Sequence, residues 1–300
     1  MAHQNNHAVN ADGIAIQTDA QPPALLYWGM QPGLMLFVFA AAAGYLPRLD
    51  AYTALLISFS ALTLVERRWP ARRQWLQSWR EWGQVVAMFA INGGAMFLVE
   101  LLLAFVPVAP FEPLHRATAK VWPSEWLLLI QALIAFTLMQ FMAYWSHRWQ
   151  HEIGILWRTF GHGTHHSYTK LSALNWNTAH PFEAVLLVMP IAVLGLLFGL
   201  GEIAIVAGAM VMVMTACAHT NIRMNERIIG LVFTTNSQHM QHHSAVFAES
   251  NTNYGCAMTL WDRVFGTFSA GDTQALGDPM EGERTLWKRL TLPLKTNLGV

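Results

Sequence analysis

Six apolar stretches recur before residue 220, and their length is the feature that most constrains the fold. They lie at about 24–46, 51–65, 83–108, 126–145, 184–200 and 203–219. A helix needs about 20 apolar residues to cross ~30 Å of hydrocarbon, where every backbone polar group must be bonded within the protein. The stretches at 51–65 and 184–200 are short for that distance. The sequence therefore predicts an all-α, polytopic membrane bundle with about four to six transmembrane helices.

The composition and charge agree with a membrane protein. Hydrophobic residues make up 54% of the 300 residues and charged residues only 12%, which is about half the usual share of a soluble domain. Because the net charge is zero, a nucleic acid would not be attracted over long range, and we expect no nucleic-acid partner. The only cysteines, Cys217 and Cys256, exclude a disulfide framework and a cysteine-based zinc site.

Lys and Arg residues predict the orientation, because short positively charged loops stay on the cytoplasmic side. With six crossings and the N-terminus inside, fifteen of the eighteen Lys and Arg residues fall on the inner side. Only Arg48, Arg116 and Lys120 fall outside. We therefore expect an integral, multi-pass membrane protein with a cytoplasmic N-terminus.

Histidines cluster in the second half of the chain, with ten of the thirteen between positions 147 and 243. Eight of them form three boxes, which are His147 and His151, then His162, His165 and His166, then His239, His242 and His243. Residues i, i+3 and i+4 share one face of a helix, so each box can direct two or three imidazoles to one point. His180 and His219 fall on the same side of the membrane as the boxes, because the chain crosses twice between them.

These ten histidines predict a dinuclear metal centre in a cytoplasmic helical cap. Ten nitrogens exceed what one ion takes, but they suit two ions with about five each and leave room for water, oxygen or a bridging group. A lone histidine is as often a structural residue as a metal ligand. We therefore expect His3, His7 and His115, which lie outside the boxes, to be non-ligands. A metal-bound imidazole usually donates its other N–H to a carboxylate, amide or carbonyl. The candidates for that role, each of which could also be a plain cap or surface residue, are Glu152, Glu183, Asn221, Asn225, Asn236 and Asp262.

The ligand type alone leaves the metal open, because imidazole accepts zinc, copper, iron or nickel. His151-Glu152 lacks the second histidine of the His-Glu-x-x-His zinc helix. The only Glu-x-x-His pair of the di-iron carboxylate pattern, at 112–115, contains proline and is predicted on the opposite face. No dinucleotide or phosphate-binding loop is present, so electrons would come from a separate protein.

Residues 126–270 resemble the membrane fatty acid hydroxylase / sterol desaturase superfamily of histidine-rich integral-membrane di-iron oxygenases. The resemblance is carried by the three boxes and by four further elements, which are His180-Pro181, His219-Thr220-Asn221, Asn253-Tyr254-Gly255 and Trp261–Thr267. It implies two non-haem irons, dioxygen as co-substrate and hydroxylation of an unactivated C–H bond of a fatty acyl, sterol or related lipid. It also implies an external electron-transfer protein of ferredoxin or cytochrome type, and no catalytic residue beyond the metal site. Thr178 departs from the family, whose members often carry a basic residue there.

Three other functions stay open at this point. Some members of the superfamily desaturate their lipid on the same kind of site. A membrane metal transporter would need histidines at mid-bilayer depth, and a haem carrier would use two or four histidines facing across a bundle, whereas the boxes follow the predicted crossings.

We divide the chain into a disordered polar N-terminal tail (1–23), an N-terminal transmembrane region (24–125), the catalytic region (126–270) and a C-terminal tail (271–300).

Overall fold

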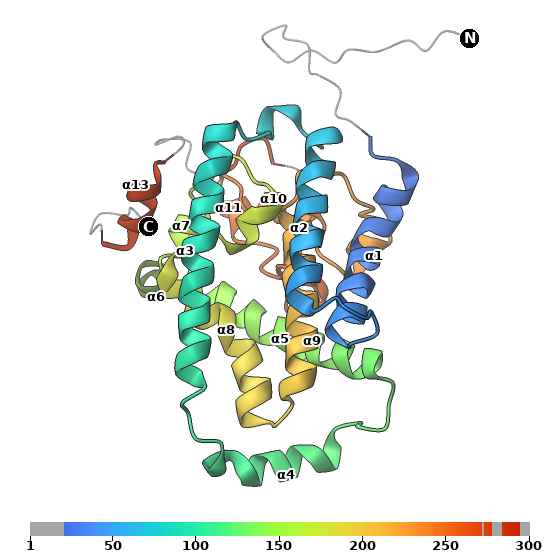
Figure 1. Cartoon of the computed structure of the whole chain (residues 1–300). Helices are drawn as coiled ribbons and strands as arrows, with labels where there is room; N and C mark the ends of the chain where they lie inside the picture. The colour runs from blue at the N-terminus through green and yellow to red at the C-terminus, as the bar shows by residue number, and fades with distance from the viewer. Residues whose placement is uncertain (1–20, 272, 278–283, 295–300) are drawn as a thin grey trace, which may run out of the picture.

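The computed structural model describes residues 21–271, 273–277 and 284–294 (Figure 1). The long helices are α1 (Ala24–Ala42), α2 (Ala51–Arg68), α3 (Trp79–Leu103), α5 (Leu128–Glu152) and α9 (Gly201–His219). The shorter ones are α4 (Glu112–Val121), α6 (Gly154–Phe160), α7 (His162–His165), α8 (Ala184–Ala192), α10 (Asn236–His242), α11 (Phe247–Ser250), α12 (Leu260–Phe265) and α13 (Leu286–Leu290). Short 3₁₀ turns lie at Arg73–Trp75, Ala109–Phe111, Ala173–Asn177, Pro181–Glu183, Ile229–Leu231 and Leu292–Leu294. These described ranges contain no β-strand, only two isolated bridges, so the predicted all-α class is confirmed.

Four helices are long and apolar enough to cross a membrane: α1, α3, α5 and α9. The segment Pro181–Leu197 is a shorter apolar helix, in which α8 continues into a π-helical turn at Val193–Leu197. Figure 1 shows α1, α2, α3, α8 and α9 running side by side along the bundle, with α4 lying across one end. Four to six crossings were expected, and the four long apolar helices agree with that range.

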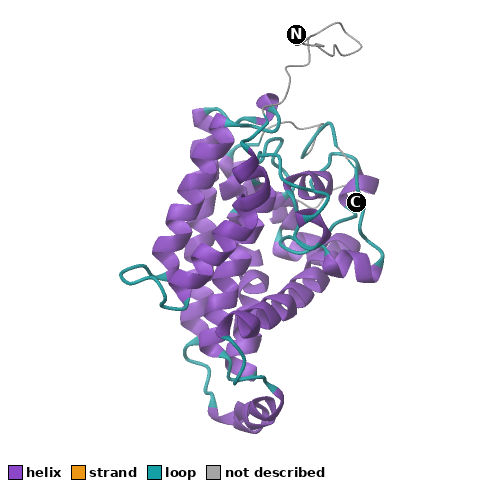
Figure 2. Cartoon of the chain, turned by 90° about the vertical axis from the view of Figure 1, so that its right-hand side faces the viewer, coloured by secondary structure: helices purple, strands orange, loops and turns teal. Residues whose placement is uncertain are grey.

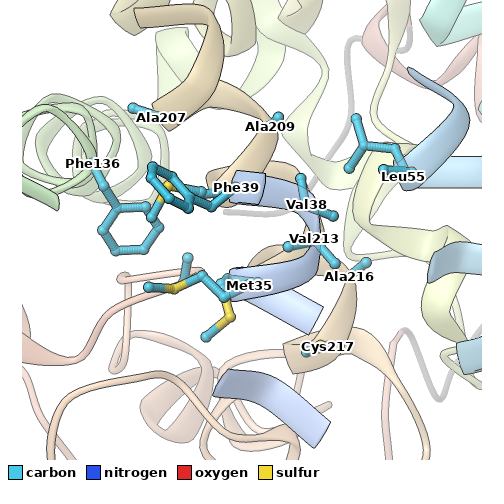
Figure 3. Packing of buried hydrophobic residues seen from close by; sticks show 14 of the residues in the cluster. Met35, Val38, Phe39, Leu55, Phe136, Ala207, Ala209, Val213, Ala216 and Cys217 are labelled. Carbon is cyan, nitrogen blue, oxygen red and sulfur yellow. The ribbon is translucent and has the colours of Figure 1, made fainter. Parts of the chain in front are cut away.

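Helix α9 occupies the centre of the bundle. Its apolar window is 67% buried, compared with 22% for α3. Small residues such as Ala207 and Ala209 let neighbouring helices approach its backbone closely. Figure 3 shows Val38 and Phe39 of α1 and Phe136 of α5 gathered around this helix. The helix that ends at His219 is therefore held firmly by apolar packing.

The histidine-bearing segments gather at one end of the bundle, where Figure 2 shows the loops and short helices that follow α9. Part of the segment predicted to be a C-terminal tail, 271–300, packs into this cap. Arg289 of α13 is completely buried, donates to Ser167 Oγ at 3.1 Å and stacks on Tyr168. The predicted disordered tail at 1–23 lies, except for residues 21–23, outside the described residues.

Candidate metal centre

Nine of the ten predicted ligands meet in two groups. The five-histidine group consists of His147, His151, His162, His166 and His242, and the four-histidine group consists of His165, His219, His239 and His243. In each group, one ring nitrogen of every member lies within 4.8 Å of those of all the others. The three boxes thus converge as predicted, and His219 joins them.

Helix periodicity decides which group each histidine joins. In the second box His162 and His166, four residues apart, enter the five-histidine group, whereas His165 enters the other. In the third box His239 and His243, also four residues apart, enter the four-histidine group. Residues i and i+4 lie on one face, so the second and third boxes each contribute a pair to one group and a single ring to the other, while both histidines of the first box enter the five-histidine group.

A glycine makes room for the second box. Gly161 ends α6 with φ +72°, a left-handed conformation that glycine adopts without strain. A Cβ at this position would also lie 2.6 Å from Pro293 and 2.7 Å from His180. Both the backbone turn into α7 and the close packing around it therefore require glycine.

Hydrogen bonds fix the tautomers of two rings in the five-histidine group. Nδ1 of His147 donates to the Tyr254 carbonyl at 2.7 Å, and Nδ1 of His242 donates to the Thr252 carbonyl at 2.8 Å. Because a carbonyl only accepts, both rings carry their proton on Nδ1 and a lone pair on Nε2. The two Nε2 atoms lie 3.0 Å apart. Two lone pairs at this distance repel each other unless a cation lies between them.

The spacing of the nitrogens in this group suits a metal ion. Nε2 of His162 lies 2.9 Å from that of His147 and 3.1 Å from that of His151, which lies 3.2 Å from Nε2 of His166. A metal bound ~2.1 Å from each imidazole nitrogen places neighbouring ligands ~3.0 Å apart when they meet at right angles. The arrangement therefore fits one ion that all five rings surround.

The four-histidine group has the same spacing. Nε2 of His219 lies 3.2 Å from Nε2 of His165 and 3.0 Å from Nε2 of His239. Nδ1 of His219 donates to the Thr215 carbonyl at 2.8 Å, which again leaves a lone pair on Nε2. Both ring nitrogens of the completely buried His243 have no hydrogen-bond partner among the described residues. Buried polar atoms are normally bonded, so these nitrogens fit a ligand role.

Burial also keeps the rings in the form that binds metal. Six of the nine grouped histidines lie outside the long helices, and the pKa of each of these six lies well below the ordinary 6.5. They are His162, His165, His166, His239, His242 and His243. Loss of water around the ring is the largest cause, and repulsion from neighbouring imidazoles adds to it. These rings are neutral at pH 7, as metal binding requires.

Two of the acidic residues predicted to support the ligands do so. The Glu183 carboxylate accepts from Nδ1 of His162 at 2.8 Å and is buried beside it. Asp262 supports His147 indirectly, because it accepts the backbone N–H groups of Tyr254 and Gly255 at 2.8 Å each. It thereby positions the Tyr254 carbonyl that holds His147.

The prediction of a supporting role is wrong for the other four candidates, which have structural roles instead. Glu152 pairs with Arg148 at 2.8 Å, Asn221 bonds the backbone of Arg72, and Asn225 accepts the N–H of Ile228 in its own loop. Asn236 is the first residue of α10, and none of these four bonds a histidine within the described part of the chain. The residue that sequence reasoning missed is Asn251, whose Oδ1 lies 3.2 Å from Nδ1 of His151.

His180 is the one predicted ligand that the fold keeps out of both groups. Its Nδ1 accepts from the N–H of Phe182 at 3.2 Å, and its Nε2 donates to the Leu290 carbonyl at 3.1 Å. With both nitrogens engaged, His180 caps the turn at Pro181–Glu183 and holds the C-terminal segment. His115 lies outside both groups, as predicted, and bonds the Leu196 carbonyl; His3 and His7 fall outside the described residues.

An apolar cavity lies against both groups. Its wall includes His147 and His162 of the five-histidine group and His165 and His219 of the four-histidine group. The remaining wall is mainly apolar and is contributed by α3, α5, α8 and α9. An apolar wall of this kind suits a hydrocarbon ligand.

Comparison with known proteins agrees with this architecture. Residues 132–267, which contain all nine histidines of the two groups, match the fatty acid hydroxylase family. The ornithine lipid hydroxylase OlsE of Rhizobium tropici is 28% identical over 220 residues, which are 71% of this chain and 65% of that protein. The alkylglycerol monooxygenase of Homo sapiens is 30% identical over 152 residues, which are 50% of this chain and 32% of that protein.

A sterol enzyme matches over a similar region. The Delta(7)-sterol 5(6)-desaturase of Eremothecium gossypii is 25% identical over 164 residues, which are 54% of this chain and 44% of that protein. The chain therefore spans less than two thirds of the length of each of these three relatives. No solved structure matches the chain.

Proposed function

We propose that this chain, which belongs to the membrane fatty acid hydroxylase / sterol desaturase superfamily through residues 132–267, hydroxylates an unactivated C–H bond of a lipid. The observation that carries the proposal is the apolar cavity, whose wall contains histidines from both groups. A hydrocarbon segment in this cavity would lie next to two metal sites at once.

Two non-haem irons are the proposed cofactors, one held by each histidine group. The lone pairs that face each other within the five-histidine group, and the similar spacing in the four-histidine group, support one ion in each. When bound, the two irons would supply the activation of dioxygen. In the balanced reaction, a lipid C–H bond, O₂, two electrons and two protons give a C–OH group and one water. The electrons would come from a separate ferredoxin- or cytochrome-type protein, since the sequence has no dinucleotide-binding motif.

The chain's own residues would bind and orient the lipid. Methylene groups are chemically almost alike, so the position of the chain in the cavity selects the carbon that reacts. Met96, Leu187 and Val211 line the cavity and would exclude water from the oxidised position. Because one relative is an ornithine lipid hydroxylase, aminolipids are the first substrate class to test.

The proposed location is an integral membrane protein whose N-terminus and histidine groups face the cytoplasm. The start of α1 and the Arg-rich loop between α2 and α3 lie at the end of the bundle that carries the cap in Figure 1. The excess of Lys and Arg in these segments supports the orientation.

Lipid desaturation is the second candidate, favoured by the similarity to the sterol desaturase. It would consume the same O₂, two electrons and two protons, but would form a C=C bond and two waters. The relatives give no support to the metal-transport alternative.

Product analysis with labelled dioxygen tests this proposal. The iron-loaded protein in lipid nanodiscs would be supplied with a reduced electron carrier, ¹⁸O₂ and a bacterial lipid extract. We expect a lipid product that gains one ¹⁸O atom and that forms only when iron and the carrier are both present. A product that loses two hydrogens without gaining ¹⁸O would favour desaturation. No oxidised lipid under any of these conditions would contradict the proposal.

A further inference from the structure

A second pocket, which is polar, lies at the cap end of the bundle. Three arginines line it, which are Arg72, Arg223 and Arg227, and Glu226 is the only acidic residue among its described lining residues. None of these lining residues belongs to a histidine group or to the wall of the apolar cavity. The excess of positive charge predicts that this pocket binds an anion.

Two loops that are far apart in the sequence bring the arginines together. Arg72 follows α2, whereas Arg223 and Arg227 follow α9. The Asn221 side chain accepts the N–H of Arg72 at 3.0 Å and donates to its carbonyl at 2.8 Å, which joins the two loops. The Arg72 guanidinium stacks on the buried Trp75, 4.4 Å from the ring centroid. A guanidinium has five N–H donors in a fork that matches a phosphate, so it can bind one in addition to its partners within the protein.

An apolar groove between α1 and α2 lies at the same end of the bundle. Its lining residues on α1 run from Leu25 to Leu34, which corresponds to about 14 Å of helix. Leu62 and Val65 of α2 form the other side. Gly33 also lines the groove, and a Cβ at this position would have nothing within 4 Å. This open, apolar groove suits an acyl chain.

The first turn of α1 joins the groove to the polar pocket. Leu25 and Leu26 line the groove, and Tyr27 lines the pocket. The Tyr27 carbonyl accepts the N–H of Asn225 at 3.2 Å, so the loop that carries Arg223 is held against this turn. Figure 1 shows α1 and α2 side by side, with the start of α1 and the end of α2 at the cap end. A charged head and an apolar tail of one ligand can therefore bind to adjacent surfaces.

We infer that this site binds an anionic phospholipid, with its phosphate at the three arginines and an acyl chain in the groove between α1 and α2. The site is separate from the apolar cavity at the histidine groups, so the lipid that it binds is not the one that is oxidised. Anionic lipids carry the negative surface charge of the cytoplasmic leaflet, which is the proposed side of the cap. A zwitterionic lipid would add a positive charge near the arginines and should bind less tightly.

Native mass spectrometry of the purified full chain in detergent tests this inference. Phosphatidylglycerol and phosphatidylcholine with the same acyl chains would be added in competition. We expect one phosphatidylglycerol per chain, bound about tenfold or more tightly than phosphatidylcholine. Glycerol phosphate, which has the phosphate but no acyl chain, should not displace it at the same concentration. Equal affinities for the two lipids, or displacement by glycerol phosphate, would overturn the inference.

A substitution in the pocket tests the role of the arginines. Arg227 is exposed, so Arg227→Gln should not disturb folding, and it should weaken phosphatidylglycerol binding about fivefold. Arg73→Gln is the matched control, because Arg73 carries the same charge on the loop after α2 but is not among the described lining residues. Its affinity should equal that of the wild type. Equal losses in the two variants would show a general attraction to basic residues and would overturn the site.

A second pair of variants tests the groove. Gly33→Leu places a side chain in the groove and should weaken phosphatidylglycerol binding. Gly94→Leu is its control, because a Cβ at Gly94 of α3 also has nothing within 4 Å but lies outside the groove. Undiminished binding by Gly33→Leu would overturn the placement of the acyl chain, and the wild-type preference between the two lipids decides independently if a variant does not fold. These measurements need neither iron nor turnover, so their failure would leave the proposed function intact.

Discussion

The two histidine groups share one kind of ligand but are held differently. In the five-histidine group, four rings use Nδ1 to bond a second residue, with His147 and His242 on backbone carbonyls, His162 on Glu183 and His151 on Asn251. In the four-histidine group only His219 does so, and Nδ1 of His165, His239 and His243 has no partner in the described ranges. Bonds to the outer nitrogen fix the tautomer and the ring orientation. The five-histidine group is therefore the more preorganised site.

The four-histidine group depends instead on burial. His239 and His243 are completely buried, and His219 ends the helix at the centre of the bundle. Packing holds these rings near one another but leaves their rotation less constrained than a hydrogen bond would. We therefore expect the two sites to differ in metal affinity.

Loss of a ligand should have the largest effect. His242→Ala removes a ring whose Nε2 lies 3.0 Å from that of His147, so we expect iron in the five-histidine group to be lost. Activity should fall at least a hundredfold, as measured by iron content and lipid turnover. His115→Ala is the control, because its ring bonds the Leu196 carbonyl away from both groups. Full turnover by His242→Ala would show that this ring is not a ligand.

Loss of a supporting carboxylate should have the next largest effect. Glu183→Gln weakens the acceptor of His162 Nδ1, and such supports typically change metal affinity or activity about 10–100-fold. Glu152→Gln is matched in chemistry, but its carboxylate pairs with Arg148 at the surface and should have little effect. Competition with a chelator measures the metal affinity of both variants. Equal losses of metal affinity in the two variants would show that the Glu183 carboxylate supports metal binding no more than the Glu152 carboxylate does.

The difference between the groups also predicts the order of metal release. On titration with a chelator, the four-histidine group should lose its iron first, with an affinity about tenfold or more below that of the better supported group. Iron content followed against chelator concentration should show two steps of one ion each. In Glu183→Gln the two steps should move closer together. A single step in the wild type would contradict the asymmetry.

The smallest effect is expected at His180. Its ring bonds only the backbone of Phe182 and Leu290, so His180→Ala should keep both irons and lose about 1 kcal/mol of stability. Iron content and the midpoint of thermal unfolding test this. Loss of one iron in this variant would restore His180 as a ligand.

The three boxes were predictable because helix periodicity directs histidines four residues apart to one face. The division into five and four follows from the same periodicity within the boxes at 162–166 and 239–243. The prediction of a supporting residue failed where a residue next to a histidine in the sequence points away from that histidine in the structure. Glu152 follows His151 directly, but adjacent residues of a helix face different directions, so its carboxylate reaches Arg148 instead.

The supports of the rings were harder to predict. His147 and His242 bond the backbone carbonyls of Tyr254 and Thr252, and a carbonyl is present at every residue, so it leaves no signal in the sequence. His180 resembled a ligand in sequence, but the proline that follows it begins a 3₁₀ turn and directs its Nδ1 to Phe182. The all-α bundle was predictable because the apolar stretches are long enough to impose it.

The central claim is that two metal ions lie in two separate histidine groups, and anomalous scattering tests it most directly. Diffraction data from the iron-loaded protein, collected on both sides of the iron absorption edge, should give two anomalous peaks. One peak should lie among His147, His162 and His242, and the other among His165, His219 and His239. A single peak, or a peak outside both groups, would contradict the account.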